Sequence, residues 1–138
     1  MRILAVDPGS KRIGLAISDP TGSIAGPLAV IPHVARLVDA AAVAAQAAAH
    51  AAGLIVVGQS FDDDGLPTFE GRRSARFAEA LKTQTSIPVV LWDEAFTTRE
   101  ARAARIEMGV SRKRRTGHLD ELAATILLQS YLEANPQP

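Results

Sequence analysis

Apolar residues gather in short runs along the first third of the chain, and each run ends at a polar residue or a turn. The run from Arg2 to Asp7 predicts a buried strand with a polar end. Apolar residues alternate with small ones from Arg12 to Ser18 and predict a second strand, and Pro8-Gly9-Ser10 between the two is typical of a turn. These two strands should form an antiparallel hairpin. A third strand is predicted from Ala25 to Ile31, at an edge of the sheet because Pro27 lacks a backbone donor.

Strand and helix patterns alternate through the rest of the chain. Val34 to Ala52 contains 11 alanines, which favour a helix, and Gly53 stands where a helix C-terminal glycine belongs. Gly109 to Gly117 is predicted to be a basic loop. The same criteria predict two further strands and three further helices, at Leu54–Val57, Val89–Trp92, Glu70–Gln84, Thr97–Met108 and Leu119–Leu132. Hairpin strands followed by β-α units predict an α/β fold with a mixed five-stranded sheet flanked by helices, in a single domain spanning residues 1–138.

Composition excludes several classes of protein. The chain has 138 residues, of which 47% are hydrophobic and 22% charged, a balance that fits one globular domain. It has no cysteine, so a disulfide scaffold, a thiolate zinc site and a cysteine nucleophile are all excluded. The alanine-rich segment is interrupted by Arg36, Asp39, Gln46 and His50, so we expect no membrane span. With no export signal either, we expect a cytoplasmic protein.

Charge is balanced overall but is unevenly distributed. The formal net charge is zero, yet residues 99–115 hold seven basic residues against two acidic ones. The run Arg112-Lys113-Arg114-Arg115 lies in this segment, and we expect it to bind nucleic-acid phosphates, although a merely solvated loop is the alternative. Lys11 and Arg12 are also assigned to nucleic-acid binding. Arg12 lies close to Asp7 in sequence and could instead pair with an acid of the site.

Three acidic residues occupy predicted element ends, where a sheet-based site would need them. Asp7 ends the first strand, Glu94 follows a later strand beside Asp93, and Asp120 opens the last helix. Hard cations such as Mg²⁺ and Mn²⁺ bind carboxylate oxygens, and two such ions can activate a water and stabilise the leaving oxygen of a phosphodiester. Each acid also has a structural interpretation, as a turn residue, as a loop acid, or as a favourable charge at a helix start. Their shared placement favours a metal site.

Taken together, these motifs resemble the YqgF/RuvX family. These are nucleases of bacterial pre-ribosomal RNA, related to the RuvC Holliday junction resolvases. The resemblance covers nearly the whole chain in the correct order. Two places differ from the common family pattern: Ala95 stands where an arginine is frequent, and Gln59-Ser60 replaces a GxP turn. The matching segments are Asp7-x-Gly9-x-Lys11-Arg12-Ile13-Gly14-x-Ala16-x-Ser18-Asp19, Val57-Gly58 with Asp64-Gly65, Asp93-Glu94-x-x-Thr97-Thr98, Gly109-Val110-Ser111-Arg112-Lys113, and Asp120-x-x-Ala123-Ala124 with Leu127-Leu128-Gln129-Ser130-Tyr131-Leu132.

The resemblance implies an RNase H-like fold and a metal-dependent nuclease. Asp7, Glu94 and Asp120 would be the catalytic acids and would hold Mg²⁺ or Mn²⁺, with Asp93 as a weaker ligand. The expected function is hydrolysis of phosphodiester bonds in 5′-end maturation of pre-16S rRNA, by a monomer or homodimer. Two alternatives stay open: a Holliday junction resolvase or DNA-repair nuclease acting on branched or single-stranded DNA, and a non-catalytic RNA-binding module of ribosome maturation. An actin-like kinase is disfavoured because the chain is too short for two lobes.

Several other residues have structural interpretations that compete with functional ones. Thr97-x-x-Glu100 matches a capping box at a helix start. Trp92 lies on an apolar strand and is expected in the core. Phe61 and Phe69 flank a polar loop, where they could either stack on unpaired bases or pack the loop down.

Overall fold

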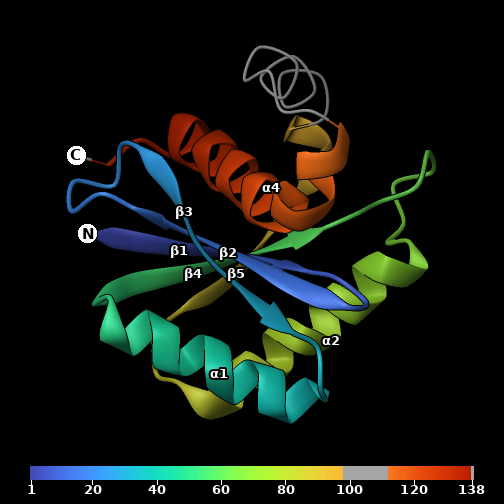
Figure 1. The fold of residues 1–138 in the computed structure, drawn as a ribbon, viewed down its shortest axis with the longest axis horizontal. Helices are drawn as coiled ribbons and strands as arrows, with labels where there is room; N and C mark the ends of the chain where they lie inside the picture. Colours follow the sequence, from blue (N-terminus) through green and yellow to red (C-terminus); the bar gives the residue numbers. More distant parts are fainter. Residues whose placement is uncertain (98–111, 138) are drawn as a thin grey trace.

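A mixed five-stranded sheet forms the centre of the molecule (Figure 1). The computed structural model describes the backbone of residues 1–97 and 112–137, and the side chains of residues 1–95 and 121–137. The strand order is β3-β2-β1-β4-β5. The bounds are β1 Arg2–Pro8, β2 Arg12–Ser18, β3 Ala25–Pro32, β4 Ala52–Gln59 and β5 Val89–Asp93.

The strand directions confirm the predicted sheet. β1, β2 and β3 form antiparallel neighbours, whereas β1, β4 and β5 run parallel to one another. β3 lies at one edge, as Pro27 predicted, and among the described strands it pairs with β2 alone. β1 and β4 lie inside the sheet with both faces covered, which is why their sequences read as continuous apolar runs rather than alternating ones.

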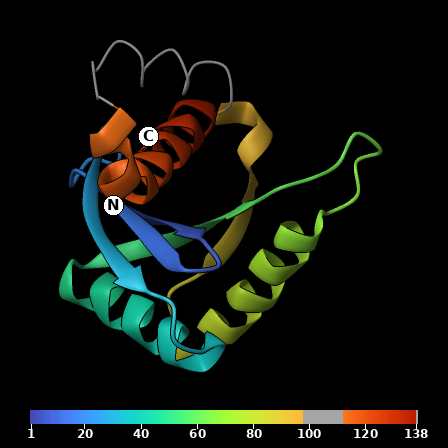
Figure 2. The ribbon, with the colours of Figure 1, turned by 45° about the vertical axis from the view of Figure 1, so that its right-hand side comes forward.

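Helices cover the two faces of the sheet in separate layers. α1 (Arg36–Ala49) and α2 (Phe69–Gln84) pack on one face, and α4 (Arg112–Ala134) packs on the other (Figures 1 and 2). Successive residues of β1 point to opposite faces, so Leu4 and Val6 lie in the core under α1 and α2, while Ile3 and Ala5 lie in the core under α4. By the same alternation, Asp7 belongs to the α4 face and Pro8 to the face of α1 and α2.

The connection between α1 and β4 differs from the sequence prediction. The helix was expected to run from Val34 to Ala52 and to end at Gly53, but it ends at Ala49, and Gly53 lies inside β4. The left-handed residue of the turn is Ala51, with a φ of 53°. Ala48 and Gln46 accept hydrogen bonds from the residues that end the helix, so the turn forms around an alanine instead of a glycine.

The last helix begins earlier than predicted. Leu119–Leu132 was expected to be the helix and Gly109–Gly117 a basic loop, but α4 already starts at Arg112. The basic run is therefore helical, which agrees with the high helix propensity of arginine and lysine. The predicted helix at 97–108 and its Thr97–Glu100 capping box extend outside the described residues. Thr97 itself is the last residue of a short 3₁₀ helix, η1 (Glu94–Thr97).

Trp92 has the structural role expected of it. Its ring meets Tyr131 of α4 edge-on, with the ring centroids 5.2 Å apart, and its indole N–H donates to the Ser130 hydroxyl over 2.9 Å. β5 is thereby tied to α4. No helix in the described part of the chain is long and apolar enough to cross a membrane.

Candidate active site at the carboxyl ends of the parallel strands

Asp7 and Glu94 come together at one edge of the sheet. β1, β4 and β5 are parallel neighbours, so their C-terminal ends meet there. Asp7 is the penultimate residue of β1, and Glu94 follows β5 as the first residue of η1. A hydrogen bond joins the two carboxyl groups. Two carboxyl groups can share a hydrogen bond only when one of them carries a proton, so this bond belongs to the state in which Glu94 is protonated.

The surroundings of Glu94 favour its neutral form. Burial, then the charge of Asp7 and the hydrogen bond to it, raise the pKa of Glu94 to about 7. Asp93 and Glu70 add smaller repulsions in the same direction. Raised pKa values from burial and like charge are typical of functional carboxylates. A cation placed at this pair would relieve that repulsion.

Gly58 provides the space that Glu94 occupies. It lies in β4 opposite Trp92, between the ends of β1 and β5. A Cβ atom at this position would lie 2.9 Å from Oε1 of Glu94 and 2.9 Å from Cδ2 of Leu127 in α4. The absence of a side chain therefore lets the glutamate approach β4 closely. In the sequence, Val57-Gly58 is only part of a motif, and no pattern there indicates a role for Gly58.

Glu70 is a second residue that sequence reasoning missed. It lies in the first turn of α2, and its charge reaches Glu94. Its Oε2 also forms an ion pair with Nη1 of Arg73, 3.0 Å away. Glu70 follows a strand and a loop and matches no recognised pattern, so only the folded chain shows that it belongs near the site.

Asp93 has a structural task beside the pair. Its Oδ1 accepts a hydrogen bond from the backbone N–H of Ala95 over 2.8 Å, which caps the start of η1. The second oxygen is not used by this bond. Asp93 thus holds the turn that presents Glu94, and its weaker metal-binding role stays a prediction.

Asp120 lies within α4, not at its start. The helix begins eight residues earlier, so a favourable charge in a first turn no longer accounts for this acid. Ala124 and Leu127 follow it by one and two helical turns, and both are buried against the sheet. Leu127 also lies beside the position of Gly58. The Asp120 side chain is outside the described residues, so its role as a ligand stays a prediction.

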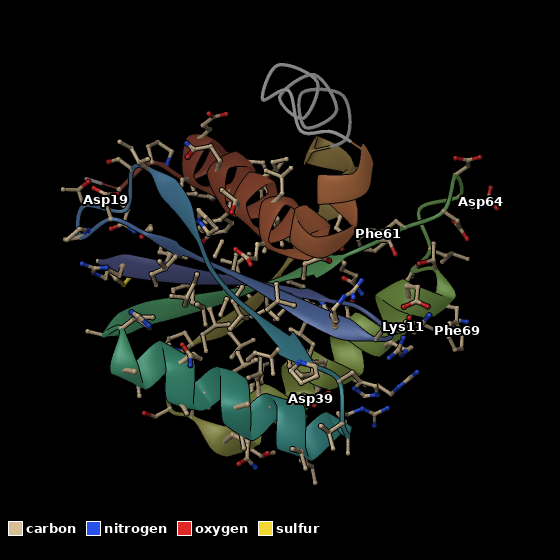
Figure 3. All side chains as sticks on the ribbon, viewed as in Figure 1. Lys11, Asp19, Asp39, Phe61, Asp64 and Phe69 are labelled. Carbon is tan, nitrogen blue, oxygen red and sulfur yellow. The ribbon has the colours of Figure 1, made fainter. Side chains whose placement is uncertain are left out.

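The residues expected to bind nucleic acid lie in two places. Lys11 is exposed at the tip of the β1–β2 hairpin (Figure 3), and the exposed Arg12 begins β2. Arg112, Lys113, Arg114 and Arg115 form the first turn of α4, and their side chains lie outside the described residues. Phosphate binding by these residues stays a prediction.

Asp19, which ends the opening motif, has a structural explanation. Its Oδ1 accepts hydrogen bonds from the backbone N–H groups of Ser23 and Ile24, and its Oδ2 accepts one from the hydroxyl of Thr21. These bonds hold the pKa of Asp19 well below its usual range. The residue organises the β2–β3 turn, away from Lys11 and Phe69 (Figure 3).

The loop between β4 and α2 forms a projecting arm, which we define as residues 60–68 (Figures 2 and 3). Asp62 organises its tip by accepting N–H bonds from Asp64 and Leu66. Phe61 is 37% exposed and Phe69 62% exposed, so neither ring packs the arm down tightly. Both rings are therefore accessible on the surface, and their stacking on unpaired bases stays a prediction.

Solved structures establish the class of fold. Thermus thermophilus RuvC in complex with a Holliday junction superposes with a TM-score of 0.59 at 18% identity, over 98% of this chain and 96% of the other. The fowlpox virus resolvase bound to junction DNA gives 0.58 at 16% identity, over 99% and 100%. The fold is thus that of RuvC-like nucleases of the RNase H class, as the resemblance implied.

Sequence comparison then identifies the family. A family model described as "RuvX: Holliday junction resolvase" matches residues 1–134. Proteins named "Putative pre-16S rRNA nuclease" from Thermoanaerobacter pseudethanolicus and Syntrophus aciditrophicus are 39% and 37% identical. The matches cover 97% and 99% of this chain, and 97% and 91% of the relatives. The chain belongs to the RuvX family.

Proposed function

We propose that this protein is a divalent-metal-dependent nuclease that hydrolyses phosphodiester bonds of precursor 16S rRNA. The observation that carries the proposal is the Asp7–Glu94 pair at the carboxyl ends of adjacent parallel strands, where ligands bind in layered α/β folds. The names of full-length relatives at 37% and 39% identity support RNA as the substrate. We expect the protein to act in the cytoplasm.

The donor set of this pair fits a hard divalent cation. Mg²⁺ and Mn²⁺ prefer carboxylate oxygens, and two adjacent carboxylates that repel each other are stabilised when a cation replaces their shared proton. Among the described side chains, no three histidine, aspartate or glutamate groups cluster closely enough to complete a site. We propose that Asp120, the third acid that the family pattern implies, completes the set. Bound metal would supply Lewis acidity and an activated water.

The protein's own groups would prepare the site for the substrate. Glu94 would release its proton to solvent near neutral pH, which makes the pair fully anionic. Gly58 would keep Glu94 against β4, and Asp93 would hold the turn that carries it. Lys11, Arg12 and the basic start of α4 would contact the phosphate backbone without reading bases.

The test is cleavage of an end-labelled precursor fragment of 16S rRNA, with single-stranded DNA and a four-way junction as competing substrates. Each is incubated with Mg²⁺, with Mn²⁺ or with EDTA. Asp7→Asn and Glu94→Gln should each lower cleavage by at least about 100-fold, because each removes a charge that binds metal. Asp64→Asn, on the tip of the arm, is the matched control and should cleave normally. Metal-dependent cleavage that persists in Asp7→Asn would refute the mechanism.

Resolution of Holliday junctions is the second candidate function. It is favoured by the description of the matching family and by the fold shared with RuvC. A resolvase must cut two strands symmetrically and therefore needs two sites in a dimer. Preferential cleavage of the four-way junction by a dimer would establish this function in place of RNA processing. Binding of RNA without cleavage under any metal would instead support a non-catalytic module.

A further inference from the structure

A pocket of about 300 Å³ lies on the opposite face of the sheet from α4, at the same edge as the carboxylate pair. The turn after β1 forms one wall through Pro8 and Gly9. The start of α1 forms a second wall through Arg36, and the second turn of α2 forms a third through Arg73. Ile13 and Phe77 close the bottom, and both are nearly fully buried. We call this the arginine pocket.

Two arginines and one acid supply the charged groups that line this pocket. Arg36 and Arg73 line it, whereas its one acid, Asp39, is 2% exposed. Asp39 is also satisfied locally, because it accepts hydrogen bonds from the His33 ring and from the backbone N–H of Val34. Its carboxylate thus holds the β3–α1 connection, and it forms no ion pair with Arg36 or Arg73.

Both arginines keep donors available for a ligand. Within the described part of the chain, Arg36 forms no ion pair. Arg73 uses one guanidinium nitrogen for Glu70, while a guanidinium carries five N–H donors. α1 also begins at this pocket; its N-cap residue Ala35 offers no capping side chain, and Asp39 places a negative charge in the first turn of the helix.

The arginine pocket adjoins the carboxylate site. Pro8 of its wall directly follows Asp7, and the two point to opposite faces of the sheet. Glu70 also lies between the arginine pocket and the carboxylate pair, since it forms an ion pair with Arg73 and its charge raises the pKa of Glu94. A strand that contacted both regions would have to pass over the sheet edge between them.

We propose that the arginine pocket is a phosphate subsite that holds one backbone phosphate of the nucleic-acid strand, next to the bond that is cut. Paired guanidinium groups with free N–H donors are suited to phosphate oxygens. Nothing in this arrangement reads bases, so the subsite positions any sequence. The inference rests on the proposed nuclease function for its strand, but its test needs no cleavage.

The experiment measures binding of a fluorescent single-stranded RNA by anisotropy in EDTA, where loss of nuclease activity has no influence. Arg36→Gln/Arg73→Gln should weaken binding about 10- to 100-fold, as expected for lost charge-assisted hydrogen bonds. The slope of log affinity against log salt should fall by about 0.7, the value for one phosphate on a single strand. Arg76→Gln, an exposed arginine on the same helix outside the pocket, is the matched control.

A neutral methylphosphonate placed at each linkage in turn then locates the phosphate. One position should weaken binding to the wild-type protein and to Arg76→Gln, and should have no effect on the double variant. Arg36→Gln alone keeps the Glu70–Arg73 ion pair and should show a partial loss of RNA affinity. This single variant keeps the proposal testable if the double variant does not fold. Equal slopes for the double variant and Arg76→Gln, or an undiminished methylphosphonate effect in the double variant, would overturn the proposal. Inorganic phosphate is also tested as a competitor of the RNA at constant salt. If phosphate competes but no methylphosphonate weakens binding, the pocket is a site for free phosphate and the proposal is wrong.

Discussion

Replacing Asp7 with asparagine should make the metal-free protein more stable, and only at high pH. Asparagine keeps the size of the side chain and can still accept the hydrogen bond of a protonated Glu94. It removes the charge that opposes ionisation of Glu94. Since the pKa of Glu94 is raised from 4.5 to about 7 in the folded chain, the folded state binds a proton that the unfolded state releases in this range. Stability therefore falls as pH rises from about 4.5 to about 7, and the loss is complete above that.

The magnitude follows from the same shift. A displacement from 4.5 to about 7 corresponds to about 3 kcal/mol when each pH unit is about 1.4 kcal/mol. The Glu94 carboxyl is partly accessible, and solvent screening reduces this to about 1–2 kcal/mol. Burial is the largest cause of the pKa shift and Asp7 is the next. Asp7→Asn should therefore raise the free energy of unfolding at high pH by about 1 kcal/mol. For a chain of this length that is about 3–5 °C in Tm.

The measurement is thermal unfolding by circular dichroism in EDTA at pH 5 and pH 8. Asp7→Asn should melt about 3–5 °C above the wild type at pH 8 and within about 1 °C of it at pH 5. Mg²⁺ or Mn²⁺ should raise the Tm of the wild type at pH 8 and have little effect on the variant. Asp64→Asn provides the charge-matched control. A variant that follows the wild-type pH profile would refute the shared-proton argument.

Three further substitutions test the packing around the site and the fold. Gly58→Ala should lower the cleavage rate at least about 10-fold in a folded protein, because its Cβ would lie 2.9 Å from Oε1 of Glu94; unchanged turnover would contradict this role. Ser18→Ala should cost about 1–3 kcal/mol in chemical denaturation, because it leaves the buried backbone N–H of Ile3 without its 2.8 Å acceptor, and a smaller loss would mean that water replaces it. Ala51→Gly should raise the free energy of unfolding by up to about 1 kcal/mol in chemical denaturation, because glycine adopts the observed φ of 53° without strain, and a destabilised variant would count against that interpretation.

The strands could be predicted from the sequence because a strand that is buried on both faces has a continuous run of apolar residues. β1 and β4 are covered by helices on each side, and their continuous apolar runs follow from that. Pro8-Gly9 predicted the turn of the hairpin, and the proline in β3 predicted that this strand lies at an edge of the sheet. The two acids that end parallel strands could be placed together on the same basis, since parallel strands finish at one edge of the sheet.

What the sequence did not reveal depends on contacts between distant segments. Gly58 looks like any strand glycine until Glu94 lies against it. Glu70 looks like a surface acid of a helix start until α2 brings it near β5. The early start of α4 was missed for a different reason: four basic residues suggest a solvated loop, while their helix propensity favours a helix once the apolar residues after them anchor it.

The alternation of side chains in β1 explains why one strand end can serve two kinds of site. Asp7 belongs to the face of α4, where Glu94 lies, and Pro8 belongs to the face of the arginine pocket. The turn that follows is closed by a hydrogen bond from the Gly9 N–H to the Arg12 carbonyl, and a Cβ on Gly9 would collide with that same oxygen. The hairpin therefore fixes both faces at once, because Asp7 and Pro8 cannot move independently. In this arrangement, one turn sets the positions of the proposed metal-binding carboxylate and of the proposed phosphate subsite relative to each other.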